Sequence, residues 1–307
     1  YMEYLEKYAY TPDKEAIGRA IEMIAANMDN IASEQVYKDC FSMMDLTTLK
    51  TDDTPASVVK LVDKVNAFQD LYPEWPLPAS VCIYSNFAAT VKEARKKDFN
   101  ITVVSACFPS SQSFLEVKLK EVEMAVEQGA DEVDIVLALN AFLAGNHEAA
   151  AEEIRQVRRV MDEVAGKQGR KVHLKVILET GLLRTPENIA EASFLAMEAG
   201  ADFIKTSTGK VDVNATPLSA YVMCECIARY YAVTGKKIGF KPAGGISTAA
   251  DALCYYSIVS YVLGKEWLNK EMFRFGVSRV ANNIAIAFSF FFFIDSLSPF
   301  RKSLPKC

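Results

Sequence analysis

The chain has 307 residues, half of them hydrophobic and about a quarter charged, which is typical of a globular protein with a large core and excludes a disordered or fibrous chain. Its formal net charge of −5 argues against a nucleic-acid partner, because binding to a phosphate backbone needs clustered Lys and Arg. The first forty residues carry no secretion signal, so we expect a cytoplasmic protein. A helical pattern at Ile17, Ile21 and Ile24 predicts a helical packing extension over residues 1–40.

Residues 41–283 alternate between short β-rich runs and helical patterns. The runs lie near 41–46, 80–84, 101–105, 132–137, 172–178, 202–206, 238–242 and 273–277. Eight such runs separated by helices predict an α/β fold of the closed (β/α)₈ TIM-barrel type. An open doubly wound sheet is the alternative, but no G-x-G-x-x-G follows the first run.

Helix ends between these runs are marked by cap residues. Thr11, Thr185 and Thr216 each precede a proline, a pair that predicts an N-cap followed by the first helical turn. Gly129 and Gly166 end two amphipathic patterns, where a left-handed residue commonly follows a helix.

The chain ends in an unusually apolar segment. Residues 284–294 are almost continuously hydrophobic, which is shorter than the roughly 20 residues needed to span a bilayer. We therefore expect a final buried helix here, with a membrane anchor as the less favoured alternative, so that residues 284–307 form an apolar helix and tail and the protein has no membrane partner.

Charged residues interrupt the predicted strands. Asp134, Lys175, Lys205 and Lys241 each lie within an apolar run, although barrel strands are buried on both faces. Residues 127–134 and 198–205 repeat one pattern, so Asp134 and Lys205 occupy equivalent places on the fourth and sixth strands. Alternate strands share an interior layer of a barrel, so these two side chains should face each other. A purely structural ion network is the alternative to a functional site.

Two of these lysines predict a particular chemistry. A lysine with an ordinary pKa is protonated at neutral pH, but burial and a second cation favour the neutral amine. Lys205 beside Lys241 on the next strand would have both, and could then attack an aldehyde to form an imine (a Schiff base). Glycines and hydroxyls follow the sixth, seventh and eighth strands, at 206–210, 242–248 and 276–278, where many barrels bind phosphate through backbone amides.

A metal site is not expected. The seven cysteines include no C-x-x-C pair, and the two histidines, His147 and His173, lie far from any cysteine cluster. An odd number of cysteines suits reduced thiols.

Six runs resemble the deoxyribose-phosphate aldolase family. They are 44–49 (MDLTTL), 130–134 (ADEVD), 175–181 (KVILETG), 201–210 (ADFIKTSTGK), 213–217 (VNATP) and 239–245 (GFKPAGG). The resemblance implies a class I aldolase, a lyase that reversibly cleaves 2-deoxy-D-ribose 5-phosphate to D-glyceraldehyde 3-phosphate and acetaldehyde. It implies no metal or organic cofactor and a role in deoxyribose phosphate catabolism.

The resemblance also implies roles for individual residues. Lys205 would form the imine, Lys241 would lower its pKa, and Asp134 would move protons with Lys241, through a water. The substrate-binding residues would be Asp45, Thr47, Lys175, Thr208, Gly209, Lys210, Gly244, Gly245, Gly276 and Ser278. Arg279 departs from the family pattern and could reach the phosphate.

Two other functions remain open from the sequence. One is a phosphosugar isomerase on the same barrel, without a covalent intermediate. The other is a catalytically degenerate barrel that serves as a scaffold. A homo-oligomer is possible in each case.

Overall fold

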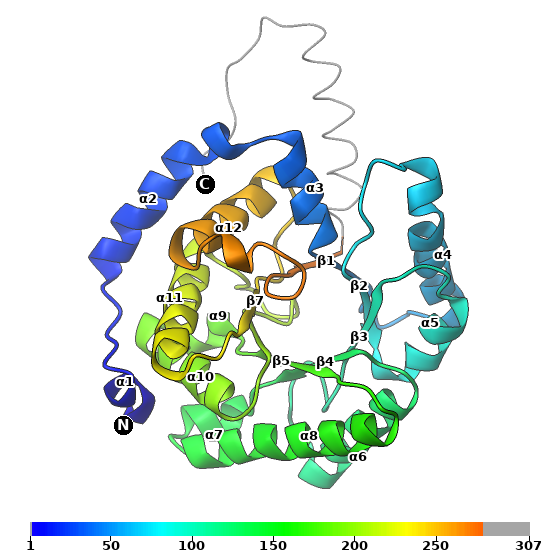
Figure 1. Cartoon of the computed structure of the whole chain (residues 1–307). Helices are drawn as coiled ribbons and strands as arrows, with labels where there is room; N and C mark the ends of the chain where they lie inside the picture. The colour runs from blue at the N-terminus through cyan, green and yellow to red at the C-terminus, as the bar shows by residue number, and fades with distance from the viewer. Residues whose placement is uncertain (1, 279–307) are drawn as a thin grey trace, which may run out of the picture.

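A computed structural model describes residues 2–278, and eight parallel strands form the centre of the molecule (Figure 1). They are β1 (Met44–Thr47), β2 (Ser80–Tyr84), β3 (Asn100–Val104), β4 (Glu132–Val136), β5 (His173–Ile177), β6 (Phe203–Lys205), β7 (Gly239–Lys241) and β8 (Phe275–Val277). Their order is β7-β6-β5-β4-β3-β2-β1-β8, and single bridges from Phe240 to Phe273 and from Ala243 to Gly276 connect its two ends. The expected (β/α)₈ barrel is confirmed.

Helices surround the strands on the outside, as Figure 1 shows. Those that connect successive strands are α4 (Pro55–Leu71), α5 (Ala88–Ala94), α6 (Leu115–Glu127), α8 (His147–Lys167), α10 (Pro186–Glu198), α11 (Pro217–Thr234) and α12 (Ala249–Val262). Short elements at the connections are α7 (Leu139–Leu143), α9 (Thr180–Leu183), η1 (Ser85–Phe87) and η2 (Lys265–Trp267). The strands are therefore covered on the face that points away from the barrel axis.

Three helices precede the first strand: α1 (Glu3–Lys7), α2 (Lys14–Ile31) and α3 (Glu34–Ser42). Ile17 and Ile24 of α2 are buried, and the buried carboxylate of Glu191 in α10 accepts hydrogen bonds from the first turn of α1. The first strand was expected to begin near residue 41, but Phe41 belongs to α3 and stacks on Phe68 of α4 at 4.6 Å. The strand begins at Met44.

Two of the three expected threonine caps are confirmed. Thr185 and Thr216 accept hydrogen bonds from backbone amides in the first turns of α10 and α11. The expected cap at Thr11 is wrong. Asp13 caps α2 instead, because its carboxylate accepts hydrogen bonds from two backbone amides, those of Glu15 and Ala16.

Of the two expected glycine helix ends, one is confirmed. Gly129 follows α6 with φ of +108°. Gly166 lies inside α8, which continues to Lys167, and Gly169 has the positive φ, +67°.

The predictions for residues 284–307 and Arg279 concern residues outside those described. Between residues 2 and 278, no helix combines the length and the hydrophobicity that a membrane crossing requires.

Candidate active site

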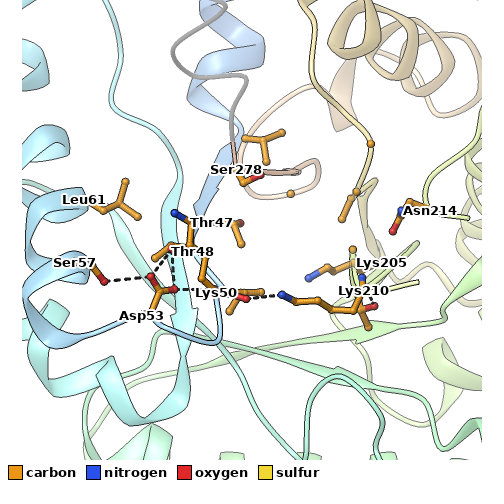
Figure 2. A pocket seen from close by; sticks show the side chains of 18 of the residues that line it. Thr47, Thr48, Lys50, Asp53, Ser57, Leu61, Lys205, Lys210, Asn214 and Ser278 are labelled. Carbon is orange, nitrogen blue, oxygen red and sulfur yellow. Dashed lines mark hydrogen bonds between the residues drawn. The ribbon is translucent and has the colours of Figure 1, made fainter. Parts of the chain in front are cut away.

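A pocket of about 610 Å³ lies at the carboxyl ends of the strands, next to the last described residues (Figure 2). Most of the predicted site residues line it: Thr47, Lys205, Thr208, Gly209, Lys210, Gly244, Gly245, Gly276 and Ser278. This is the end of a barrel where loops after successive strands converge. Figure 2 shows that Lys205 and Lys210 approach the pocket from the side opposite Ser57 and Leu61.

The alternation of side chains along each strand explains which of them point into the barrel. Residues two apart on a strand point to the same side, so Glu132 and Asp134 of β4 both point into the barrel. Parallel register places Asp134 beside Lys175 of β5, and Lys205 beside Lys241 of β7. The Nζ atom of Lys205 donates to Oδ2 of Asp134 at 2.8 Å, so the two residues that the repeated pattern paired are in contact.

Lys205 has the properties of a nucleophile. It lines the pocket with its amine end while only 3% of the residue is exposed. Burial, and then the positive charge of Lys241, lower the pKa of Lys205, against the opposing effect of Asp134. A larger fraction of the amine is therefore uncharged than in a solvated lysine.

Lys241 is held in the opposite state. Burial alone would lower the pKa of Lys241, but the carboxylates of Asp134 and Asp45 outweigh it and raise the pKa well above its ordinary value. Its Nζ lies 2.8 Å from Oδ2 of Asp134 and 2.5 Å from Oδ2 of Asp45. Burial alone would raise the pKa of Asp134, but Lys175, Lys205 and Lys241 hold it far below its usual range. The site therefore combines a fixed ammonium, a fixed carboxylate and one amine of reduced basicity.

Two residues expected to bind substrate lie elsewhere. Asp45 and Lys175 are fully buried and are not among the residues that line the pocket. Asp45 pairs with Lys241 and with Arg274, whose Nη1 is 2.8 Å from Oδ1 of Asp45. Lys175 pairs with Glu132 and, at 3.2 Å, with Asp134. The structure therefore places Asp45 and Lys175 in an ion network below the pocket floor.

The network includes two residues that the sequence analysis did not select. Arg274 precedes β8 and donates from Nη2 to Oε1 of Glu132 at 2.6 Å. Glu132 could have been found, because it lies two positions before Asp134 on the same face of β4. Arg274 gives no such signal, since an arginine near a strand end usually reaches solvent.

Three further lysines, which the sequence did not predict as site residues, add positive charge to the pocket wall. Lys50, Lys60 and Lys64 line it together with Lys210, whose Nζ donates to the backbone oxygen of Leu49 at 2.5 Å. Lys60 and Lys64 are one turn apart on α4, a spacing that in the sequence is typical of a solvated helix face. Several cations around one cavity favour an anionic ligand.

Glycines also line the pocket. Gly209, Gly244 and Gly245 have φ between +76° and +79°. A Cβ on Gly244 would lie 2.5 Å from Oδ1 of Asn214, so the backbone can approach the pocket only without a side chain here. Such turns expose backbone amides to an anion.

Within residues 2–278 no group of three His, Cys, Asp or Glu side chains is arranged to hold a metal.

Comparison with known proteins decides the family. The model of the DeoC/LacD family aldolase matches residues 40–254. The chain belongs to the DeoC/LacD aldolase family. This aldolase is 42% identical over 254 residues to the deoxyribose-phosphate aldolase of Homo sapiens, covering 79% of this chain and 77% of that relative. It is 39% identical over 252 residues to the enzyme of the same name from Bos taurus, covering 78% and 77%.

Solved structures share the fold of this aldolase. The tetrameric deoxyribose phosphate aldolase from Aeropyrum pernix is 21% identical with a TM-score of 0.64, covering 91% of this chain and all of that one. At that identity the likeness supports the barrel alone.

Proposed function

We propose that this aldolase reversibly cleaves 2-deoxy-D-ribose 5-phosphate to D-glyceraldehyde 3-phosphate and acetaldehyde through an imine on Lys205. The observation that carries the proposal is the shared oxygen of Asp134, which lies 2.8 Å from the amines of both Lys205 and Lys241. Relatives with about 40% identity are deoxyribose-phosphate aldolases, and the cavity is lined by lysines suited to a phosphate.

The reaction begins at the only one of the three interior lysines that lines the pocket. The neutral amine of Lys205 attacks the aldehyde carbon of the open-chain sugar, and loss of water gives a protonated imine. The proton for the departing hydroxyl would come from Asp134 and Lys241 through a water, because the raised pKa of Lys241 makes its ammonium a poor direct donor and neither side chain lines the pocket.

The imine then accepts an electron pair. The C3 hydroxyl loses its proton, the C2–C3 bond breaks, and its electron pair forms the C1–C2 double bond of an enamine as the imine nitrogen becomes neutral. Glyceraldehyde 3-phosphate leaves. A proton adds to C2, and water hydrolyses the resulting imine to release acetaldehyde and free Lys205. Asp134 and Lys241 would exchange these protons with the substrate through a water.

The phosphate would lie beside Lys210 and the glycine turns. Lys210 and the glycine turns at Gly209, Gly244 and Gly245 line the same cavity as Lys205. We assign phosphate recognition to these residues together with Gly276 and Ser278, and sugar contact to Thr47 and Thr208. Asp45 and Lys175 would act through the buried network rather than by touching the sugar.

Borohydride reduction tests the proposal. Acetaldehyde forms the last imine of the cycle, so reduction in its presence should add a single ethyl group, located at Lys205 by peptide mapping. Lys210 lines the same pocket and serves as the internal control for non-selective alkylation. An isomerase or an inactive scaffold would show no selective ethylation. The absence of selective ethylation would therefore reject the imine on Lys205.

We also infer a cytoplasmic homo-oligomer. The six cysteines in the described part of the chain are free, as expected in a reducing compartment. The relative from Aeropyrum pernix is described as a tetramer. Sedimentation of the purified protein would decide the oligomeric state.

A further inference from the structure

Seven charged side chains inside the barrel form one continuous network of ion pairs. Their side chains are at most 4% exposed, and they are Asp45, Glu132, Asp134, Lys175, Lys205, Lys241 and Arg274. Arg274 joins Asp45 to Glu132, while Lys241 joins Asp45 to Asp134. Lys205 is at the end of the network that meets the pocket.

The network holds four basic groups and three carboxylates, so it is neutral only if one basic group is uncharged. A buried net charge is costly. Lys205 contacts one of the carboxylates, whereas each of the other three basic groups contacts at least two. Lys205 is therefore the group that gives up its proton most readily. The lowered pKa of Lys205 and the raised pKa of Arg274 agree with this balance.

We propose that Arg274 and Glu132, neither of which lines the pocket, are positioning residues that set the protonation state of Lys205 in opposite senses: the charge of Arg274 favours the neutral amine and the charge of Glu132 favours the ammonium form. The inference rests on the imine chemistry proposed for Lys205. It assigns a function to two residues that cannot reach the substrate. Their effect passes through the carboxylates and cations that separate them from the amine.

Other titratable side chains near the network are the same residues in every variant compared below. The buried thiol of Cys82 on β2 has a raised pKa and remains neutral. His173 lies 3.9 Å from Glu132, with a ring 39% exposed. At the pocket end, Glu179 accepts hydrogen bonds from Thr208, and Lys210 lines the cavity. A change at residue 274 or 132 can thus be attributed to the altered charge when a charge-retaining variant is compared.

Removal of the charge of Arg274 and removal of the charge of Glu132 should shift the pH dependence of imine formation in opposite directions. Arg274→Gln leaves the interior with one more negative charge, which favours the ammonium form of Lys205. Imine formation should then require a higher pH. Glu132→Gln leaves one more positive charge and should allow imine formation at a lower pH. For each variant we expect the rising part (the limb) of the curve of trapping rate against pH to shift by about one pH unit. At a fixed pH on this limb, that shift corresponds to roughly a tenfold change in rate.

The experiment measures the rate of borohydride trapping with acetaldehyde as a function of pH, at Lys205, in the full-length protein. Arg274→Lys and Glu132→Asp retain the charges and are the matched controls, and their limbs should stay close to that of the wild type. Opposite displacements of the two glutamine variants support the proposal. Displacements in the same direction, or equal limbs for Arg274→Gln and Arg274→Lys, overturn it.

Thermal unfolding and the result for the wild type separate the causes of failure. Thermal unfolding at each assay pH identifies a variant that does not fold. If Arg274→Gln is such a variant, the direction of the Glu132→Gln displacement relative to Glu132→Asp decides alone. No ethylation of the wild type at any pH would reject the aldolase chemistry itself. Selective ethylation of wild-type Lys205 with unmoved limbs in the variants would reject only the role of Arg274 and Glu132.

Discussion

Lys205 and Lys241 are direct neighbours across β6 and β7, and their Nζ atoms lie at equal distances, 2.8 Å, from one carboxylate oxygen of Asp134. Their pKa values nevertheless shift in opposite directions. The difference follows from their surroundings, because Lys241 also contacts Asp45 whereas Lys205 meets the pocket. One additional carboxylate thus separates a structural ammonium from a reactive amine.

This difference predicts unequal costs for two matched substitutions. Lys205→Met should abolish cleavage, with a loss of at least about 10³-fold, because Lys205 is the pocket-lining lysine whose pKa is lowered. It should unfold at nearly the denaturant concentration of the wild type. Lys241→Met leaves two carboxylates without their shared cation and should cost about 3–5 kcal/mol of stability. Urea unfolding and a cleavage assay on both variants check this, and cleavage by Lys205→Met would contradict the assignment.

Much of this site can be predicted from the sequence, because its main pair lies on regular strands. The repeat of residues 127–134 in 198–205 gives Asp134 and Lys205 the same register, and alternation along β4 gives Glu132 the same face. The pairing of Arg274 with Asp45 could not be predicted in this way, because the two residues are 229 positions apart and meet only when β8 closes the barrel beside β1.

The depth of each residue also could not be predicted. Asp45 and Thr47 are two positions apart on β1, yet Thr47 lines the pocket and Asp45 lies below it. A strand rises about 3.3 Å per residue, so two positions are enough to separate a pocket wall from the interior. A sequence motif gives the direction of a side chain but not the height of the cavity floor.

The wall lysine Lys210 should act mainly on the phosphorylated substrate. Its ammonium would exchange the backbone oxygen of Leu49 for the phosphate. Lys210→Met should raise KM for deoxyribose 5-phosphate by about 10- to 100-fold, the effect of one hydrogen bond between charged groups. The loss should be much smaller for imine formation with acetaldehyde, which has no phosphate. Steady-state kinetics and borohydride trapping compare the two, and equal losses would argue against a phosphate contact.

Acid should unfold the protein through the buried carboxylates. The pKa values of Asp45, Glu132 and Asp134 are all lowered, against the effect of burial, by the lysines and Arg274. A lowered folded-state pKa gives stability that is complete above the unfolded-state value and is lost as the pH falls towards the folded-state value. The melting temperature should therefore decline below about pH 4.

Calorimetry between neutral and acid pH measures this decline. Asp134→Asn, which removes one of the three carboxylates, should give a flatter pH dependence. A melting temperature of the wild type that stays constant down to about pH 3 would contradict a stabilising role for the ionised carboxylates.

Gly276 should not tolerate a side chain. A Cβ at this position would lie 2.6 Å from the Cβ of Ala243 and 3.3 Å from Cε of Lys241. Gly276 and Ala243 form one of the two bridges that connect β8 to the β7 end of the sheet, so neither backbone can move away freely. Gly276→Ala should therefore cost about 1–3 kcal/mol and displace Lys241.

Gly18, inside α2 with open space around it, gives the matched control. Gly18→Ala should stabilise the protein by about 0.5–1 kcal/mol. Equal stability of the two variants in urea would show that the barrel closure at Gly276 is looser than the contacts indicate.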